Sequence, residues 1–354
     1  MIQPPDSILV ICLRRIGDVL LSTPLIASLR AAWPQARIDA LVLAGTEAVL
    51  AGNPHLDGVR IARRGSRRLP FRLREYALAI STQENDRPHG YALLAGRQRV
   101  GIVPGPSNWS GRWKRWHCTA WCENGTGQRH TVEQMLKLAD CLGIARQPAV
   151  VPPRAGGAPA LPPDPAGRRL AVLHLAPMFS YKAWTIDGWR SLIADLLARD
   201  LRIWISGGPA TSERDYADAV LAPFAGEPRI IDGVGRLPLP ALADLIGSAA
   251  VYVGPDTSVT HMAAASGVPV VTLFGPSSPS VWAPWPNQPC RTGETPWQLR
   301  APVQTVGRVT VVQGIKPCVP CLLEGCDRHT ASRSACLDEL PAARVIAAVD
   351  GALR

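Results

Sequence analysis

The sequence predicts an α/β protein built from two doubly wound halves, in each of which helices cover a mostly parallel sheet. Strand, turn, helix and strand patterns occur at the start of the chain and again around residues 249–274, and a segment without periodicity separates the two regions. The length of 354 residues also exceeds what one hydrophobic core usually supports. We therefore expect two domains.

The first half has the pattern of a strand, a helix, a strand and a later amphipathic helix, at residues 7–13, 18–33, 36–43 and 130–143. Asp18 stands at the first strand-to-helix turn, and open α/β sheets bind ligands at such turns. An N-cap is the simpler interpretation of this aspartate. Arg14 and Arg15 would keep its carboxylate ionised, which favours a functional role.

The second half shows the same alternation, with strands at 170–175, 201–206, 229–231, 249–253 and 268–274 and helices at 185–199, 211–224, 238–247 and 257–266. A proline- and glycine-rich stretch without periodicity precedes it and reads as a linker. We expect an N-terminal domain at 1–150, a linker at 151–167, a C-terminal domain at 168–340 and a last helix at 341–354.

The turn after residues 249–253 is well equipped to hold an anion. Asp256 is a suitable N-cap, and the amides of Thr257, Ser258 and Val259 would point out of the helix start beside two hydroxyls. His261 follows Thr257 by four residues and so lies on the same helix face. An ordinary capped helix with a core histidine is the alternative. The whole cluster favours a phosphate site.

Composition and charge narrow the class of protein. The net charge is +10 and the isoelectric point about 9.5, which suits anionic partners such as nucleic acid, acidic lipid or a phosphorylated sugar. The N-terminal apolar run has no basic region before it and ends at Leu13, so we expect neither a signal peptide nor a membrane span. Nine cysteines, an odd number, favour reduced thiols and a cytoplasmic location.

Two stretches are rich in cations. Residues 60–74 carry many arginines without interleaved acids, and residues 109–116 alternate tryptophan with arginine and lysine. A solvated surface is the usual interpretation of such runs. Tryptophan beside cations also suits a membrane interface or an anionic glycolipid. We favour the lipid over nucleic acid, because no known nucleic-acid motif accompanies these stretches.

Three motifs stand in order along the chain: Arg15-Ile16-Gly17-Asp18 with Thr23-Pro24, Lys182 with Trp184, and residues 254–276 followed by Trp282-Ala283-Pro284. Together they resemble glycosyltransferase family 9, the ADP-heptose:lipopolysaccharide heptosyltransferases of Gram-negative bacteria. The resemblance implies a GT-B fold, with two Rossmann-like domains facing across a cleft. It also implies metal-independent, inverting transfer of heptose from ADP-heptose to the inner core of lipopolysaccharide, at the cytoplasmic face of the inner membrane and without a cofactor.

The resemblance also implies roles for individual residues. Asp18 matches the general base and Lys182 the phosphate-binding lysine. The positions that match or neighbour the family's donor-binding residues are Ser180, Glu213, Leu237, Asp256, Thr257, Ser258 and His261. The basic residues expected to contact the anionic acceptor or the membrane surface are Arg14, Arg15, Arg67, Arg68, Lys114 and Arg115. An ionised aspartate is a weak base, so stabilising the departing diphosphate should supply most of the rate.

Other functions stay open on the residues alone. The alternatives are a transferase of the same family that uses another nucleotide sugar, a nucleotide-sugar epimerase, and a non-catalytic binder of anionic glycolipid. An epimerase would need further acid and base groups, and a binder has no need of a general base. Asp18 and Lys182 therefore favour the transferase.

Four cysteines near the end have metal-site spacing, C-x2-C-x4-C-x9-C, at Cys318, Cys321, Cys326 and Cys336. A small zinc or iron–sulfur loop and buried free thiols are both compatible with it. We favour free thiols and expect no bound metal. His117, Cys118 and Cys122 form a second group, for which the surrounding tryptophans favour packing.

Overall fold

The computed structural model describes residues 3–66, 68–105, 109–124, 129–287 and 295–354. The chain divides between Pro153 and Arg154 into two compact units, here called unit 1 and unit 2. The division falls inside the proline-rich segment. There, Asp244 of unit 2 accepts hydrogen bonds from the backbone N–H groups of residues 155–157, at 2.8 to 3.1 Å.

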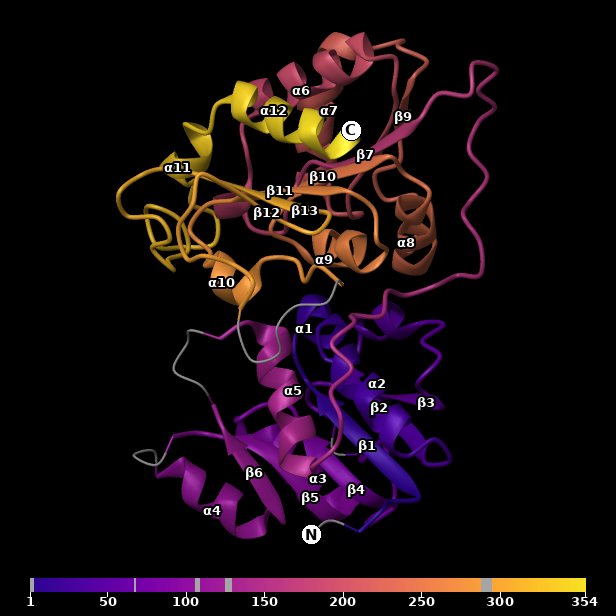
Figure 1. Cartoon of the computed structure of the whole chain (residues 1–354), viewed down its shortest axis with the longest axis vertical. Coiled ribbons are helices and arrows are strands. Elements are labelled where there is room, and N and C mark those ends of the chain that lie inside the picture. Colours follow the sequence, from indigo (N-terminus) through magenta and orange to yellow (C-terminus); the bar gives the residue numbers. More distant parts are fainter. Residues whose placement is uncertain (1–2, 67, 106–108, 125–128, 288–294) are drawn as a thin grey trace. The chain divides into compact units, whose positions relative to one another are not determined.

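Unit 1 contains a six-stranded parallel sheet in the order β3-β2-β1-β4-β5-β6 (Figure 1). The strands are β1 (Ser7–Cys12), β2 (Arg37–Leu43), β3 (Gly58–Ala62), β4 (Tyr76–Ser81), β5 (Gly96–Val103) and β6 (Ala120–Glu123). The helices are α1 (Ile16–Leu20), α2 (Thr23–Ala32), α3 (Asp86–Ala95), α4 (Ser110–His117) and α5 (Thr131–Leu142), with a 3-10 turn η1 (Glu47–Leu50). Strands β1 and β4 are buried along nearly their whole length, as expected for a sheet covered on both faces.

Unit 2 repeats this topology. Its strands are β7 (Leu170–His174), β8 (Arg202–Ser206), β9 (Ile230–Asp232), β10 (Val251–Pro255), β11 (Val270–Phe274), β12 (Val303–Val306) and β13 (Val309–Gln313). Its helical elements are η2 (Ser180–Lys182), α6 (Ile186–Ala198), α7 (Thr211–Leu221), η3 (Ala222–Phe224), α8 (Leu239–Gly247), α9 (Ser258–Ala265), α10 (Pro279–Trp282), α11 (Ala335–Asp338) and α12 (Ala342–Leu353). The order β9-β8-β7-β10-β11-β13 is parallel throughout, and β12 joins the edge antiparallel.

Strand order decides where a ligand can bind. In both units the first strand lies between the second and the fourth of its sheet, so the order reverses at that point. At such a reversal, loops typically leave in opposite directions and open a crevice at the carboxyl ends of the strands. The reversal lies between β1 and β4 in unit 1 and between β7 and β10 in unit 2. The predicted α/β fold with two Rossmann-like units is confirmed.

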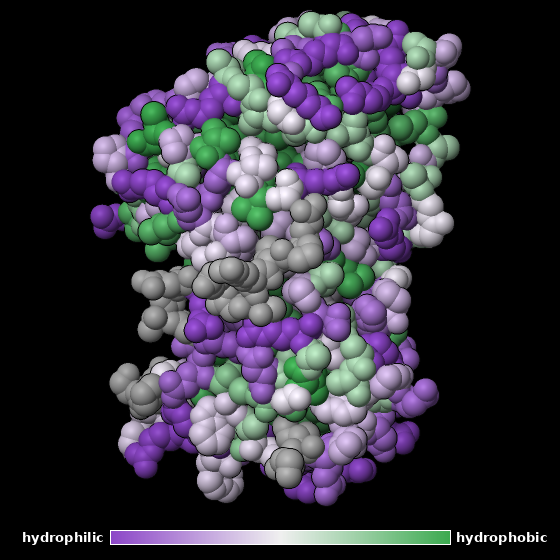
Figure 2. Space-filling view, in the orientation of Figure 1, coloured by the Kyte–Doolittle hydropathy of each residue, from purple (hydrophilic) through white to green (hydrophobic). Residues whose placement is uncertain are grey.

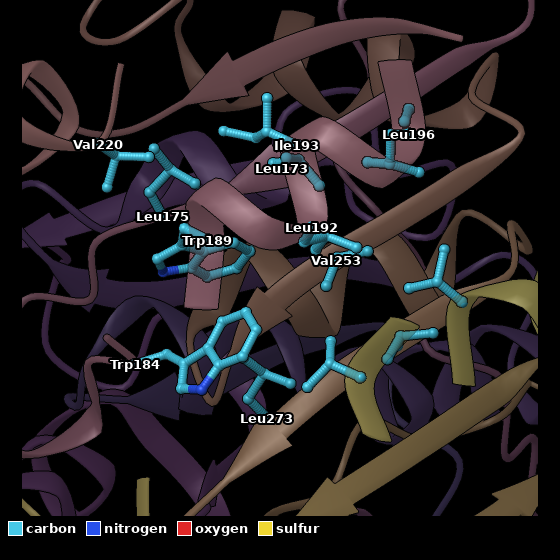
Figure 3. Close-up of a cluster of buried hydrophobic side chains, with 14 of the residues drawn as sticks. Leu173, Leu175, Trp184, Trp189, Leu192, Ile193, Leu196, Val220, Val253 and Leu273 are labelled. Carbon is cyan, nitrogen blue, oxygen red and sulfur yellow. The ribbon is translucent and has the colours of Figure 1, made fainter. Parts of the chain in front are cut away.

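The core of unit 2 holds the C-terminal helix in place. Trp184 and Trp189 are fully buried and meet edge to face, with ring centroids 5.2 Å apart (Figure 3). The indole N–H of Trp184 donates to the carbonyl of Leu340, 3.0 Å away. Val345 and Val349, one helical turn apart on α12, are buried in the same cluster. The last helix is therefore part of unit 2.

Some local predictions were wrong. The helix predicted at 18–33 is interrupted, because Leu21 and Ser22 separate α1 from α2 and Pro24 falls in the first turn of the second helix. Asp18 lies inside α1, whose N-cap is Arg15. The sequence analysis assigned no strand to β3, β4, β5, β6, β12 or β13. β3 and β12 have few buried residues and so a weak apolar signal.

Hydrophobic and hydrophilic residues are intermixed on the face shown in Figure 2. Among the residues that the structure describes, no helix is long and apolar enough to cross a bilayer.

Candidate active site

The centre of the site in unit 2 is the turn between β10 and α9. Thr257 is the N-cap of α9, with an extended backbone (φ −139°, ψ 168°), and Asp256 precedes it. The predicted N-cap role of Asp256 was therefore wrong by one residue. The first N–H groups of a helix have no partner within it and carry partial positive charge. The turn thus presents free donors at the reversal of strand order, beside the hydroxyl of Thr257.

Lys182 and Asp256 form an ion pair across this reversal. Lys182 ends η2, which follows β7, and its Nζ lies 2.6 Å from Oδ2 of Asp256 and 3.4 Å from the Asp256 carbonyl oxygen. Asp256 is buried, and burial alone would raise the pKa of its carboxyl. Burial is the largest single influence, but the charge and hydrogen bond of Lys182 together with His261 and Ser277 outweigh it and hold this pKa below its ordinary value. The carboxylate of Asp256 is therefore ionised at neutral pH.

His261 is buried in the first turns of α9, close enough to the ion pair for both of its charges to shift the His261 pKa. Burial lowers the pKa of its imidazole to about 4, so the ring is neutral at pH 7. Its Nδ1 has no hydrogen-bond partner among the described residues. Buried polar atoms are nearly always paired, so this nitrogen, beside a helix start, is a candidate contact for a ligand.

A hydroxyl chain supports the same turn. The hydroxyl of Thr260 donates to the carbonyl of Pro255 at 2.5 Å, and its oxygen lies 3.0 Å from the hydroxyl of Tyr252 and 3.2 Å from that of Thr257. Because its proton is committed to Pro255, Thr260 accepts from both neighbours. Tyr252 and Thr260 were not predicted as part of the site. Thr260 follows Thr257 by three residues on α9, and this helical spacing could have indicated that the two hydroxyls meet.

Three predicted donor residues lie in separate elements of unit 2. Ser180 is exposed in η2, two residues before Lys182. Glu213, in the first turn of α7, accepts a hydrogen bond from the N–H of Gly208 at 2.5 Å. Leu237 is half-buried before α8 and packs against a hydrophobic cluster of unit 2. Their contacts with a nucleotide stay predictions.

Asp18 of unit 1 lies after β1, on α1, at that unit's own reversal of strand order. Arg14 is 3.5 Å from its carboxylate. Burial raises the pKa of Asp18, and the charges of Arg14 and Arg15 offset this rise only in part. The arginines therefore act in the predicted direction, toward the ionised form, but burial makes the net shift of the pKa upward. A carboxylate with a raised pKa is a stronger base than an ordinary aspartate.

The sequence is similar to those of known proteins. The model for glycosyltransferase family 9 (heptosyltransferase) matches residues 127–300, which include Lys182, Asp256 and His261. This part of the chain, just under half of its length, is thus similar to glycosyltransferase family 9. Lipopolysaccharide heptosyltransferase 3 of Escherichia coli is 24% identical over 286 residues, covering 77% of this chain and 84% of the relative.

Two solved structures support the GT-B fold. One is the E. coli ADP-heptose lipopolysaccharide heptosyltransferase II, with a TM-score of 0.72 and 20% identity, covering 98% of each chain. The other is E. coli heptosyltransferase WaaC with ADP, with a TM-score of 0.65 and 21% identity, covering 79% of this chain and 90% of that one.

The basic residues predicted to contact the acceptor differ in their surroundings. Lys114 is buried and pairs with Asp86 at 2.7 Å, so the prediction that it faces the acceptor was wrong. Arg115 is mostly buried, donates to the carbonyl of Pro104 and lies 3.3 Å from Glu123. Both residues are used within unit 1.

The arginines of residues 60–74 also differ from one another in exposure and in ion pairing. Arg60 pairs with Asp39 at 3.3 Å and Glu75 at 3.2 Å, which approach from outside the stretch. Arg68 is exposed, whereas Arg67 lies outside the described residues. Arg14 is paired with Asp18, and Arg15 caps α1. Acceptor contact stays a prediction for these residues.

The outer face of α4 is aromatic. Trp109 and Trp116 are 78% and 85% exposed, and Trp113, on the same stripe, is 36% exposed. The guanidinium of Arg112 stacks over the ring of Trp109, 4.4 Å from its centroid. A helix that buries its lysine and exposes its tryptophans has a surface that suits an interface rather than bulk water.

Cys318, Cys321, Cys326 and Cys336 form no disulfide, and the prediction that their thiols are buried is wrong for two of them. Cys318 and Cys326 are exposed and Cys336 is buried, with Cys321 between these extremes. The N–H of Ala335 donates to the sulfur of Cys326 at 3.4 Å. The expectation that these four bind no metal stays a prediction.

Proposed function

We propose that this glycosyltransferase moves heptose from ADP-heptose to the inner core of lipopolysaccharide, with inversion at the sugar. The observation that carries the proposal is the arrangement of Lys182, Asp256 and His261 at the start of α9. It combines an ammonium, free helix-start amides and an unpaired buried imidazole nitrogen. These are donors suited to a diphosphate. The names of the relatives, lipopolysaccharide heptosyltransferases, supply the sugar and the acceptor.

In this proposal Lys182 stabilises the leaving group. An ammonium has three N–H donors, and two of them are directed at the Oδ2 and the carbonyl oxygen of Asp256. The third stays available for a phosphate oxygen. Asp256 thus orients Lys182 and leaves one of its three N–H donors for the ligand. As the sugar–oxygen bond breaks, negative charge grows on the diphosphate, and fixed donors lower the barrier most when charge develops.

Asp18 is the proposed general base. Inverting transfer needs a carboxylate to accept the proton of the acceptor hydroxyl while that hydroxyl attacks the sugar carbon. The hydroxyl forms the new bond, the diphosphate leaves with the electrons of the old one, and the proton goes to Asp18. The raised pKa of this aspartate supports the assignment.

We place the reaction at the inner face of the cytoplasmic membrane, with unit 1 in peripheral contact. The acceptor is an anionic lipid, and the exposed Trp109 and Trp116 offer side chains that partition into the headgroup region. Arg112 and Arg68, both exposed, add attraction for acidic lipid.

The test is a transfer assay with ADP-heptose and a lipopolysaccharide core that lacks the acceptor heptose, read out as ADP release and product mass. Wild-type protein should form the product, and Asp18→Asn should lower turnover by about two to four orders of magnitude with donor affinity nearly unchanged. Asp187→Asn is the matched control, because this carboxylate is 92% exposed at the start of α6. Normal turnover in Asp18→Asn would remove the general base from the proposal. Absence of any product with wild-type protein would reject the donor or the acceptor.

A further inference from the structure

A compact group of metal-ligand side chains lies in unit 1, on elements other than α1, which carries Asp18. His89 comes from α3, His117 is the last residue of α4 and Cys118 follows it. The three are at most 8% exposed. One ligand atom from each lies within 4.8 Å of the others, and no other such group of three His, Cys, Asp or Glu residues occurs in the described part of the chain.

The spacing of these atoms fits a tetrahedral metal site. Nδ1 of His89 lies 3.2 Å from Nε2 of His117, and the sulfur of Cys118 lies 3.9 Å from Nδ1 of His89. In a tetrahedral zinc site the usual bond lengths put two imidazole nitrogens about 3.3 Å apart, and a nitrogen and a thiolate sulfur about 3.6 Å apart. The sulfur of Cys118 also lies 3.9 Å from Nδ1 of His117, the other nitrogen of that ring, so a shift of this thiol toward Nε2 would complete the site.

The orientation of His89 is fixed by its other nitrogen. Nε2 of His89 lies 2.8 Å from the carbonyl oxygen of Ile102, and a carbonyl can only accept, so this nitrogen carries the proton. Nδ1 therefore presents its lone pair to His117 and Cys118. A Cβ at Gly101 would lie 2.6 Å from the ring, so the glycine provides the space that the ring occupies on β5. Metal-binding histidines typically have such a carbonyl partner.

The alternative is a packed core in which the Nε2–H of His117 donates to Nδ1 of His89. The ring of Trp113, stacked on His117 with centroids 5.0 Å apart, would shield either arrangement. Two cations lie nearby: Lys114, whose charge is paired with Asp86 at 2.7 Å, and Arg99, whose Nε donates to the carbonyl of His117. The thiolate of Cys118 would be the one anionic ligand among the three.

We propose that His89, His117 and Cys118 bind a divalent transition metal, with zinc as the ion best matched to two imidazoles and one thiolate. Binding displaces the thiol proton of Cys118 to solvent, and water fills the fourth position. The ion would tie α3 to the end of α4, the helix that carries the exposed tryptophans. Its role would be to hold that helix on the sheet.

The test uses the full-length protein with Cys318 and Cys321 replaced by serine. These replacements disrupt the cluster of four C-terminal cysteines, which could otherwise bind the added metal and produce a thiolate band of its own. After treatment with a chelator, this protein is titrated with Co²⁺, whose bond to a thiolate produces a charge-transfer absorption band. We expect one equivalent of Co²⁺, a band from a single thiolate, and displacement of the ion by Zn²⁺. The melting temperature should rise on adding Zn²⁺ to the chelated protein.

Variants assign the ligands. In the same background, Cys118→Ser should abolish the thiolate band, and His89→Gln should weaken Co²⁺ binding by at least about tenfold. Cys12→Ser is the matched control, because Cys12 is an equally buried free thiol outside the group. If the protein with only Cys318 and Cys321 replaced shows no thiolate band with Co²⁺, the proposal is overturned. This result does not depend on whether the further variants fold. A band that persists in Cys118→Ser also overturns the proposal.

Discussion

Replacing Lys182 by methionine separates the structural role of the Lys182–Asp256 pair from its chemical role. Methionine keeps the length of the side chain and removes its charge, which leaves the carboxylate of Asp256 buried without its partner. Breaking a buried ion pair in this way costs about 3 to 5 kcal/mol in the free energy of unfolding. Because the Lys182 side chain is 22% exposed, we expect the lower end of this range, about 3 kcal/mol.

The stability of the wild type and that of Lys182→Met should depend on pH in opposite directions. In the wild type the pKa of Asp256 is lowered, so the pair's stabilisation is fully present above the ordinary aspartate pKa of 3.8 and is lost as pH falls through the lower, folded value. Without Lys182 only His261 and Ser277 oppose the effect of burial, which is the largest single influence, so we expect the pKa to rise above the ordinary value. The folded variant then holds a proton that the unfolded chain has lost, so its stability falls as pH rises.

Urea unfolding at pH 4.5 and pH 7, followed by the fluorescence of the buried Trp184 and Trp189, measures this difference. The destabilisation of Lys182→Met should be larger at pH 7 than at pH 4.5. The double variant Lys182→Met with Asp256→Asn should recover part of the loss and show little pH dependence. A loss below about 1 kcal/mol, or an equal loss at both pH values, would show that the pair behaves as a surface salt bridge and would refute the reasoning.

Three further predictions concern activity and binding. Lys182→Ala should lower turnover by about two to three orders of magnitude and raise the Michaelis constant for the nucleotide sugar less, and unchanged turnover with lost affinity would make Lys182 a ground-state binding residue. The acid limb of the pH–activity profile should lie above the ordinary aspartate pKa of 3.8, because burial raises the pKa of Asp18, and a limb at or below that value would count against this residue as the base. The double variant Trp109→Ala, Trp116→Ala should bind vesicles of acidic phospholipid more weakly than the wild type. Trp121→Ala, which removes an exposed tryptophan outside α4, should not weaken this binding. Equal effects of the two changes would exclude a specific contact of α4 with the lipid.

The alternation of strands and helices is a local property, and the sequence determined it. Parallel strands covered on both faces read as short apolar runs, which is why β1, β7, β8, β10 and β11 were predicted within a few residues. The division near Pro153 follows from proline and glycine composition in the same way. The predicted anion-binding turn before α9 also rests on a local pattern, because an N-cap, small residues and a histidine stand within six positions.

Tertiary structure alone decided which side chains meet. Lys182 and Asp256 are 74 residues apart, and they pair because β7 lies beside β10 in the sheet. Strand order is set by the packing of the whole unit, so no local pattern contains it. The same holds for His89 and His117, which come together from α3 and α4.

Burial was the other property that the sequence could not supply. Lys114 stands in a run of tryptophans and cations that reads as exposed, yet the fold buries it against Asp86. Asp18 follows two arginines, which predicts a lowered pKa, yet desolvation raises it. Desolvation depends on every neighbour in space, whereas a sequence motif records only neighbours along the chain. The sequence therefore determined which groups could do the chemistry, and the tertiary structure decided their partners and their charge.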